Sequence, residues 1–183
     1  MIKRKDIIKI AIDSPAAAGA GTQAKLIAKH YSLLPLDTGK CYRFIANIKL
    51  AKPTKFNYLY LKKKMDKLKI KDLQNKKLLS DKVATVASII AKDKKIRKLV
   101  HSFQLKCAYN PPKKYKGSVL DGRNIISEIV PDADVKFFIT ASLKVRAIRR
   151  YKELKAKNNK ISYQEVIKSI KKRDKSDINR KIS

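Results

Sequence analysis

A short glycine-containing segment near the N-terminus has the residue types of a phosphate-binding loop. It runs from residue 13 to residue 22 with the sequence DSPAAAGAGT, directly after an isoleucine-rich apolar run. Glycines let the backbone approach an anion, and the first N–H groups of a following helix can donate to it. The usual pattern, G-x-x-x-x-G-K-[ST], also has a lysine that reaches the phosphate oxygens. Here Ser14 replaces the first glycine and Ala20 the lysine, so a small-residue turn that only packs a helix on a strand is the alternative.

Acidic and basic side chains further along the chain are the other candidates. Asp121 ends an apolar run, where a carboxylate could act on a bound magnesium ion, and a helix N-cap is the alternative. Arginines, whose forked guanidinium groups match phosphate oxygens, are concentrated towards the C-terminus. They are Arg146, Arg149, Arg150, Arg173 and Arg180. Arg146 and Arg150 are four residues apart and share one helix face, a pattern that is also typical of an ordinary solvated face.

Short apolar strands that alternate with helical segments must position these groups. Strands are predicted at 7–12, 33–36, 118–121 and 136–140. Helical segments are predicted at 19–31, about 41–48, 52–75 as a surface region, 78–105 with a break near Asp93, and 144–180 as a basic pair. Ser162 and Glu165 form a capping-box signature at the start of the second basic helix. The alternation predicts an α/β protein with a parallel sheet.

Composition narrows the class of protein and its surroundings. The 183 residues suffice for one domain, and 46 Lys and Arg against 15 Asp and Glu give a formal charge of +31. This charge attracts polyanions, but it is spread along the whole chain, so only nonspecific nucleic-acid binding is expected. Two cysteines without a C-x-x-C pair fit a reducing cytoplasm. The chain has no run of about 18 apolar residues and no signal peptide, so no membrane association is expected.

Several motifs, in order along the chain, resemble those of the bacterial cytidylate kinases. Residues 10–22, IAIDSPAAAGAGT, are similar to I-x-I-D-G-P-A-x-x-G-K-G-T, and residues 36–43, LDTGKCYR, to L-D-[ST]-G-x-x-Y-R. Residues 86–97, 120–124 (LDGRN, similar to D-G-R-D), 131–154 and 173–180 (R-D-x-x-D-x-x-R) continue the series. The resemblance covers the chain except the lysine-rich residues 52–75. It implies a nucleoside monophosphate kinase that moves a phosphoryl group from ATP to CMP or dCMP.

The resemblance also implies the architecture. The fold would be a three-layer P-loop kinase fold with a parallel sheet, all within a single domain over residues 1–183. Residues of about 52–115 would form a helical monophosphate-binding region, and residues of about 144–180 the basic lid and the helices that follow. The family continues past R-D-x-x-D-x-x-R with one more strand and a helix, so we expect the sheet here to lack that edge strand and its covering helix.

Site residues follow from the resemblance by position. The ATP-binding set would be Ser14, Pro15, Ala16, Ala17, Ala18, Gly19, Ala20, Gly21, Thr22, Arg146, Arg149 and Arg150. The CMP-binding set would be Thr38, Arg43, Ser88, Arg97, Arg123, Asn124, Arg173, Asp177 and Arg180. The catalytic groups would be Arg123 and Arg180, together with Asp121, because it ends an apolar run, and Lys40, as a substitute charge beside the turn at residues 37–39. ATP is the expected phosphate donor and Mg²⁺ the expected metal, with Thr22 as its candidate ligand, and the expected partners are small-molecule nucleotides bound by a monomer.

Three departures from the family pattern affect the expected activity. Ala20 removes the phosphate-reaching lysine, and such transition-state charge contacts are worth on the order of a thousandfold in rate, so turnover is expected to be weak. Lys25 and Lys40 are candidate substitutes, and we expect Lys40 to compensate in part. Ser14 replaces a glycine, and Asn124 replaces an aspartate, which keeps hydrogen bonding but shifts selectivity. Two other functions are weighed against the kinase: a non-catalytic nucleotide-binding descendant and a basic RNA-associated protein.

Overall fold

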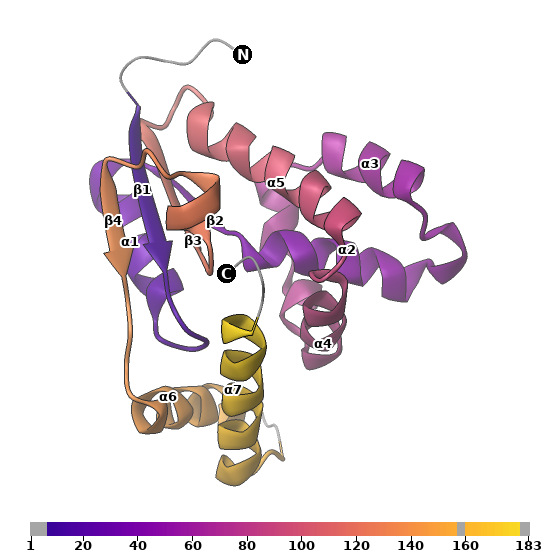
Figure 1. The fold of residues 1–183 in the computed structure, drawn as a ribbon, viewed down its shortest axis with the longest axis vertical. Coiled ribbons are helices and arrows are strands. Elements are labelled where there is room, and N and C mark those ends of the chain that lie inside the picture. Colours follow the sequence, from indigo (N-terminus) through magenta and orange to yellow (C-terminus); the bar gives the residue numbers. More distant parts are fainter. Residues whose placement is uncertain (1–6, 157–159, 180–183) are drawn as a thin grey trace.

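Four parallel strands form the centre of the protein in a computed structural model that describes residues 7–156 and 160–179. They are β1 (Ile8–Asp13), β2 (Leu34–Asp37), β3 (Gly117–Gly122) and β4 (Val135–Phe138), in the order β2-β3-β1-β4. The register pairs Asp37 with Asp121 and Asp13 with Gly122. The carboxyl ends of β1, β2 and β3 therefore meet at one edge of the sheet (Figure 1).

The strand residues alternate between two apolar layers, which explains the three-layer fold. On one face, Ile10, Ile12 and Val119 pack against the buried alanines of α1 (Ala20–Tyr31). On the other face, Ala11 and Leu120 join a larger core with α2 (Gly39–Ala51) and α5 (Lys94–Tyr109). A period of two places successive strand side chains on opposite faces, so each layer receives alternate residues. The predicted α/β class with a parallel sheet is confirmed.

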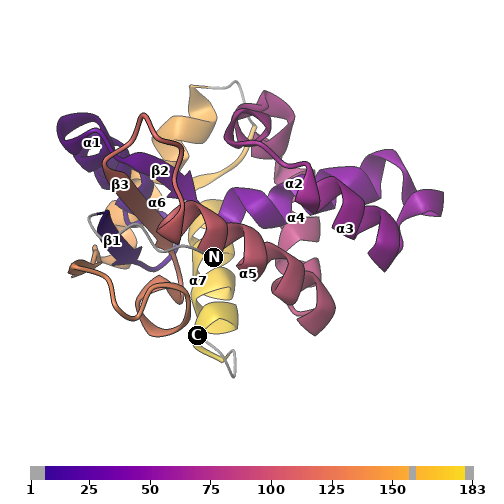
Figure 2. The same cartoon turned by 90° about the horizontal axis from the view of Figure 1, so that it is seen from above.

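A helical lobe extends beside the sheet (Figures 1 and 2). It contains α2, η1 (Pro53–Lys55), α3 (Tyr58–Asp66), η2 (Ile70–Gln74), η3 (Lys76–Leu79), α4 (Asp81–Ile90) and α5. Leu61 and Met65 of α3 are buried, so one face of the segment that we expected at the surface packs inward. The predicted break near Asp93 is confirmed, because its carboxylate caps α5 by accepting from the N–H groups of Lys95 and Ile96.

Two basic helices lie beyond the carboxyl ends of the strands (Figure 1). They are α6 (Leu143–Lys155) and α7 (Tyr163–Ile178), and they share a small apolar cluster that includes Ala147 and Val166. The predicted capping box is confirmed, since Ser162 Oγ accepts from the N–H of Glu165 while the Glu165 carboxylate accepts from the N–H of Ser162. This pair of helices has its own small core, so it is anchored to the rest of the protein mainly through polar contacts described below.

The sheet has an open edge at β4 within the described residues. β4 pairs with β1 on one side only. It begins one residue before the start of the predicted strand and ends two residues before that strand's predicted end. All four of its residues are exposed, with Phe138 70% accessible. Separately, none of the helices within these ranges combines the length and apolar character that crossing a bilayer requires.

Candidate active site

The segment from Ser14 to Gly19 connects β1 to α1 in a conformation suited to an anion. Gly19 has φ 97° and Ala17 has φ 60°, so the backbone turns through the left-handed region twice. Gly19 is the N-cap residue of α1, and no side chain caps the helix there. The first N–H groups of α1 therefore have no side-chain acceptor, and a helix N-terminus of this kind attracts phosphate. The loop has the backbone of a phosphate-binding loop, although one of its glycines is replaced.

Ala20 fills the position where the usual pattern has a lysine, and its methyl group is buried. Only 4% of the residue is accessible, and it packs with Ala24 and Ala28 against Ile10 and Ile12 of β1. A lysine here would have to run its methylene chain along this apolar contact before its ammonium reached the loop. Position 20 therefore contributes close helix–sheet packing and no charge.

Asp13, which the motifs did not identify as a site residue, joins the start of the loop to η4 (Ile125–Ile129). Its carboxylate accepts from the N–H groups of Ile125 at 2.8 Å and Ile126 at 3.0 Å. Asp13 is buried, and these two bonds satisfy a group that would be costly to bury alone. An acid directly after a buried strand was the available signal. Its role is to fix the segment that follows Arg123 and Asn124.

Asp121 and Asp37 lie side by side at the carboxyl ends of β3 and β2. Burial and, secondarily, the charge of Asp37 raise the pKa of Asp121 to about 7, against the opposing charges of Arg123, Lys40 and Lys25. A Cβ placed on Gly21 would be 3.5 Å from Asp121 Oδ2, so the first turn of α1 faces this carboxylate. Asp121 is part of a strand, and the alternative that it caps a helix is wrong.

The charges of Lys40 and Lys25 act on this same carboxylate from different helices. Lys25 is four residues after Gly21 on α1, and Lys40 lies in the first turn of α2. Both lower the pKa of Asp121, which sets their charges near the loop end of the sheet. Thr38, just before α2, donates its hydroxyl proton to the backbone carbonyl of Asp121 at 2.7 Å. The hydroxyl that was expected to contact CMP is therefore engaged in joining β2 to β3.

Three of the predicted CMP-binding arginines come together from distant parts of the chain. Arg123 Nε lies 2.8 Å from Asp177 on α7, and Arg43 donates to the carbonyl of Leu78 at 2.9 Å. Arg173 is exposed as a residue, but the protein around its guanidinium group excludes water from that group and so lowers its pKa. The positive charges of Arg123 and Arg43 lower the pKa of Arg173 further. Clustered guanidinium groups repel one another, so an anion between them is stabilised.

The arginines of α6 hold the loop through its backbone. Arg146 NH1 donates to the carbonyl of Ala16 at 3.0 Å and contacts both carboxylate oxygens of Asp174 at 3.0 and 2.8 Å. Arg149 NH1 donates to the carbonyl of Ala18 at 3.3 Å. Arg146 is buried, so the solvated-face interpretation is wrong for it. Asp174, which sequence reasoning missed, links α7 to α6 and so to the loop.

Arg150 of α6 is partly exposed and pairs with Glu153 at 3.1 Å. It also contributes to lowering the pKa of Arg173, which places its charge near the arginine cluster. Arg180 lies outside the described residues. The arginines predicted from the resemblance therefore divide into two that bind the carbonyls of the loop, the buried Arg146 and the exposed Arg149, and a group around Arg173.

Ser88 and Arg97, whose polar groups suit the edge of cytosine, and the nearby Asn124 mark the expected base end of the site, and they are only partly gathered. Arg97 of α5 lies 3.4 Å from Glu128, and Asn124 donates to the same carboxylate at 2.5 Å. Ser88 of α4 is exposed and donates to the carbonyl of Thr85 in its own helix. Glu128 is not part of any quoted motif, and no sequence signal distinguished it.

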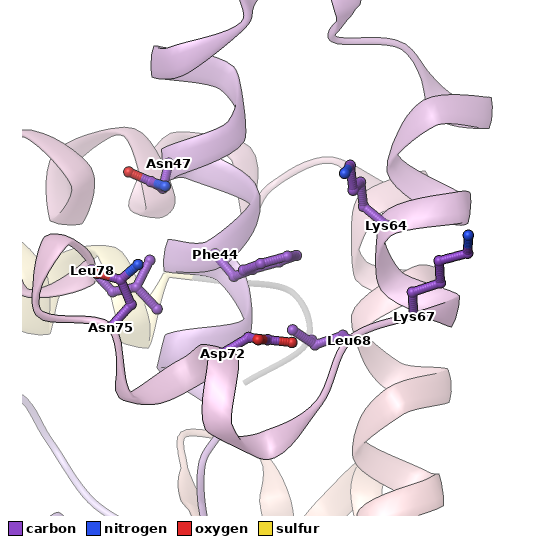
Figure 3. Close-up of a pocket in the computed structure, with 8 residues that line it drawn as sticks. All are labelled: Phe44, Asn47, Lys64, Lys67, Leu68, Asp72, Asn75 and Leu78. Atoms are coloured by element: carbon purple, nitrogen blue, oxygen red, sulfur yellow. The ribbon is translucent and has the colours of Figure 1, made fainter.

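A separate hollow lies in the helical lobe, between α2, α3 and the η2–η3 segment (Figure 3). It has a volume of about 300 Å³, and its lining comprises Phe44, Asn47, Lys64, Lys67, Leu68, Asp72, Asn75 and Leu78. Asp72 and Asn75 accept from the N–H groups of Lys69 and Lys77, so they cap short helices. The carbonyl of Leu78, which lines the hollow, accepts a hydrogen bond from Arg43 of the candidate site. We assign the hollow to packing of the lobe.

The sheet order, the loop at the end of β1 and the basic helices beyond it define the class of the protein as a P-loop kinase fold. A family model described as "Cytidylate kinase" matches residues 10–183. The chain is 41% identical over 178 residues to a protein of Bartonella tribocorum named cytidylate kinase, covering 95% of this chain and 80% of that protein. Proteins of the same name from Azorhizobium caulinodans, 41% identical (93% and 81% covered), and Clostridium tetani, 37% identical (96% and 80% covered), are similar over comparable lengths. The chain belongs to the cytidylate kinase family.

Proposed function

We propose that this protein transfers a phosphoryl group from ATP to CMP or dCMP and forms CDP or dCDP. The observation that carries the proposal is the convergence of Arg43, Arg123 and Arg173, from three separate parts of the chain, near the carboxyl end of β3. An anion-binding cluster beside a phosphate-binding loop suits a monophosphate acceptor facing a triphosphate donor. Membership of the cytidylate kinase family supports the same reaction.

The donor end is assigned to the loop and to α6. Backbone N–H groups of α1 would bind the ATP phosphates, while Arg146 and Arg149 keep the loop in shape by binding the carbonyls of Ala16 and Ala18. These two arginines bind the backbone of the loop, so loss of either would change the conformation of the loop and also remove a positive charge near it.

Mg²⁺ is the expected metal, and the residues present fit an ion that is held largely by nucleotide phosphates. No group of three or more His, Cys, Asp or Glu side chains gathers in the described ranges, and Mg²⁺ commonly uses one or two carboxylates together with substrate phosphates. Thr22 in the first turn of α1 and the adjacent pair Asp121 and Asp37 would be its protein contacts. When bound, the ion offsets negative charge on the transferring group.

Lys40 is proposed to supply part of the charge that Ala20 lacks. Its charge and that of Lys25 already act on Asp121, which faces the first turn of α1. Phosphoryl transfer depends on positive charge around the transferring group, and the charge can come from any element that reaches it. Turnover is expected to be weak because neither lysine begins at the loop itself.

The reaction is tested with purified full-length protein, ATP, Mg²⁺ and each pyrimidine monophosphate, with product nucleotides separated by chromatography. CDP formation above a no-enzyme control is expected, and Arg123→Gln should lower it strongly. Nucleotide binding without any product would favour the non-catalytic alternative. RNA binding that is salt-sensitive and survives loss of both Arg43 and Arg123 would favour the RNA-associated alternative. The monomeric state, the cytoplasmic location and purely nonspecific nucleic-acid binding stay predictions.

A further inference from the structure

A carboxylate that no motif pointed to lies at the base end of the candidate site. Glu128 in η4 contacts Asn124, four residues before it, and Arg97 of α5. Nδ2 of Asn124 donates to Oε2 of Glu128 at 2.5 Å, and Nη2 of Arg97 donates to the same oxygen at 3.4 Å. Arg97 and Asn124 are both expected to contact CMP. Glu128 therefore joins two of the residues that would surround the base.

Glu128 determines which end of the Asn124 side chain is left for a ligand. An ionised carboxylate accepts hydrogen bonds and cannot donate them, so the amide must turn its NH₂ group towards Glu128. The carbonyl oxygen of Asn124 is then the end that remains. An asparagine without such a partner can rotate its amide and present either a donor or an acceptor, whereas an aspartate presents acceptors only. Glu128 thus gives Asn124 the acceptor-only character of the aspartate that it replaces.

The second oxygen of Glu128 adds to this acceptor surface. Both hydrogen bonds above use Oε2, and within the described residues no bond uses Oε1. The side chain of Glu128 is 31% accessible, and that of Arg97 is 16% accessible. Arg97 has five N–H donors in a fixed fork, of which one is directed at Glu128. The base end therefore combines acceptors, from Asn124 and Glu128, with the guanidinium donors of Arg97.

This arrangement matches one pyrimidine and opposes the other. Cytosine has an amino donor at C4 beside acceptors at N3 and O2, and carboxylates read such an amine by accepting from it. Uracil has an oxygen at C4, which would face the acceptors of Asn124 and Glu128 without a proton between them. Buried acceptors left without a donor cost free energy, and this cost is the physical basis of discrimination.

We propose that Glu128 determines base specificity: by fixing the Asn124 amide and adding its own carboxylate, it selects cytosine monophosphates over uridine monophosphates. The proposal rests on the proposed function for the choice of ligands. Glu128 acts largely through Asn124 and is in that sense a positioning residue. The negative charge missing at position 124 is supplied four residues later in the chain.

The test compares the affinities of CMP and UMP by isothermal titration calorimetry on the full chain. The variants are Glu128→Gln, Asn124→Asp and the double variant, with Asp66→Asn, an exposed carboxylate on α3, as the matched control. Glu128→Gln should lower the CMP-to-UMP affinity ratio about tenfold or more, since a good polar contact to a base is worth about that discrimination. Asn124→Asp alone sets two carboxylates against each other and should weaken the binding of both nucleotides. Adding it to Glu128→Gln should restore the ratio, because an aspartate at position 124 needs no partner to be an acceptor. Asp66→Asn should change nothing.

Equal weakening of CMP and UMP by Glu128→Gln, or failure of Asn124→Asp to restore the ratio, would overturn the proposal, because a purely structural role predicts both.

If Glu128→Gln does not fold, the proposal can be tested on the wild-type chain with a CMP analogue that carries hydrogen in place of the C4 amine. That analogue should bind about tenfold more weakly than CMP, and equal binding would refute the proposal. Selective binding that depends on Glu128 without CDP formation would contradict the proposed function and leave this inference standing. A protein that binds neither nucleotide would contradict both.

Discussion

At the donor end of the site, position 20 has a buried methyl group where the family pattern has a lysine, whereas at the acceptor end Asn124 replaces an acid but is hydrogen-bonded to the nearby Glu128. The acceptor end thus keeps its charge by moving it four residues along the chain. The donor end keeps its backbone geometry, and the available charges of Lys25 and Lys40 come from elsewhere. A hydrogen bond acts over a short range, so a lost acceptor has to be replaced by a group that lies next to it in space. A charge acts over several ångströms, so the charge of a lost lysine can be supplied from a neighbouring helix.

The acceptor end is most easily broken at Arg123. Arg123→Gln removes a guanidinium from the cluster and breaks its 2.8 Å ion pair with Asp177, so we expect kcat/KM for CMP to fall by about a hundredfold or more. The measurement is steady-state CDP formation, with Lys62→Gln on the exposed face of α3 as the control. A loss below about threefold would mean that this cluster does not bind the transferring or accepting phosphate.

The donor end should respond in the opposite direction to Ala20→Lys. Restoring the loop lysine should raise kcat about tenfold or more if the loop is otherwise competent. The new methylene chain must pass the packed alanines of α1, so a small loss of thermal stability should accompany the gain. Ala20→Met is the control, since it adds a chain of similar length without charge and should give no rate gain. An unchanged kcat in a folded Ala20→Lys protein would show that the loop is remodelled.

Between the two ends, Asp121 should make stability depend on pH. Its pKa is raised to about 7, so the unfolded chain gives up this proton near pH 4 while the folded chain keeps it until about pH 7. The unfolded state therefore binds fewer protons in that range, and stability falls as pH rises through it. Asp121→Asn should remove this fall and be more stable than wild type at pH 8 by on the order of 1–2 kcal/mol, measured by urea denaturation. Parallel stability profiles of wild type and variant from pH 4 to 8 would refute the raised pKa, and Asp66→Asn should follow wild type.

What could be predicted from the sequence depends on how local each feature is. Features that neighbouring residues determine could be predicted from their local pattern. They are the loop at residues 14–19, the break at Asp93 and the capping box of Ser162. The α/β class with a parallel sheet followed from strand–helix alternation, and the three-layer architecture from the resemblance. The fold around the site could be outlined because several motifs occur in a fixed order along the chain.

The contacts that complete the site could not be predicted, because they join distant positions. Spacing alone made Arg146 resemble a solvated residue, yet its partner carbonyl belongs to Ala16, 130 positions earlier in the chain. The bonds from Ile125 and Ile126 to Asp13 and the pairing of Arg97 with Glu128 also depend on how the sheet brings segments together. Local patterns identify groups capable of chemistry, whereas the pairing of those groups is a property of the fold.

The central claim, that charge from Lys40 replaces the missing loop lysine, is tested most directly by a double-mutant cycle on kcat for CDP formation. Lys40→Ala should lower kcat about tenfold in the wild-type chain and by less than about twofold in the Ala20→Lys chain, because a restored lysine makes the substitute redundant. Lys25→Ala, measured in the same two backgrounds, separates the contributions of the two lysines. Equal effects of Lys40→Ala in both backgrounds, or no effect in either, would contradict the account.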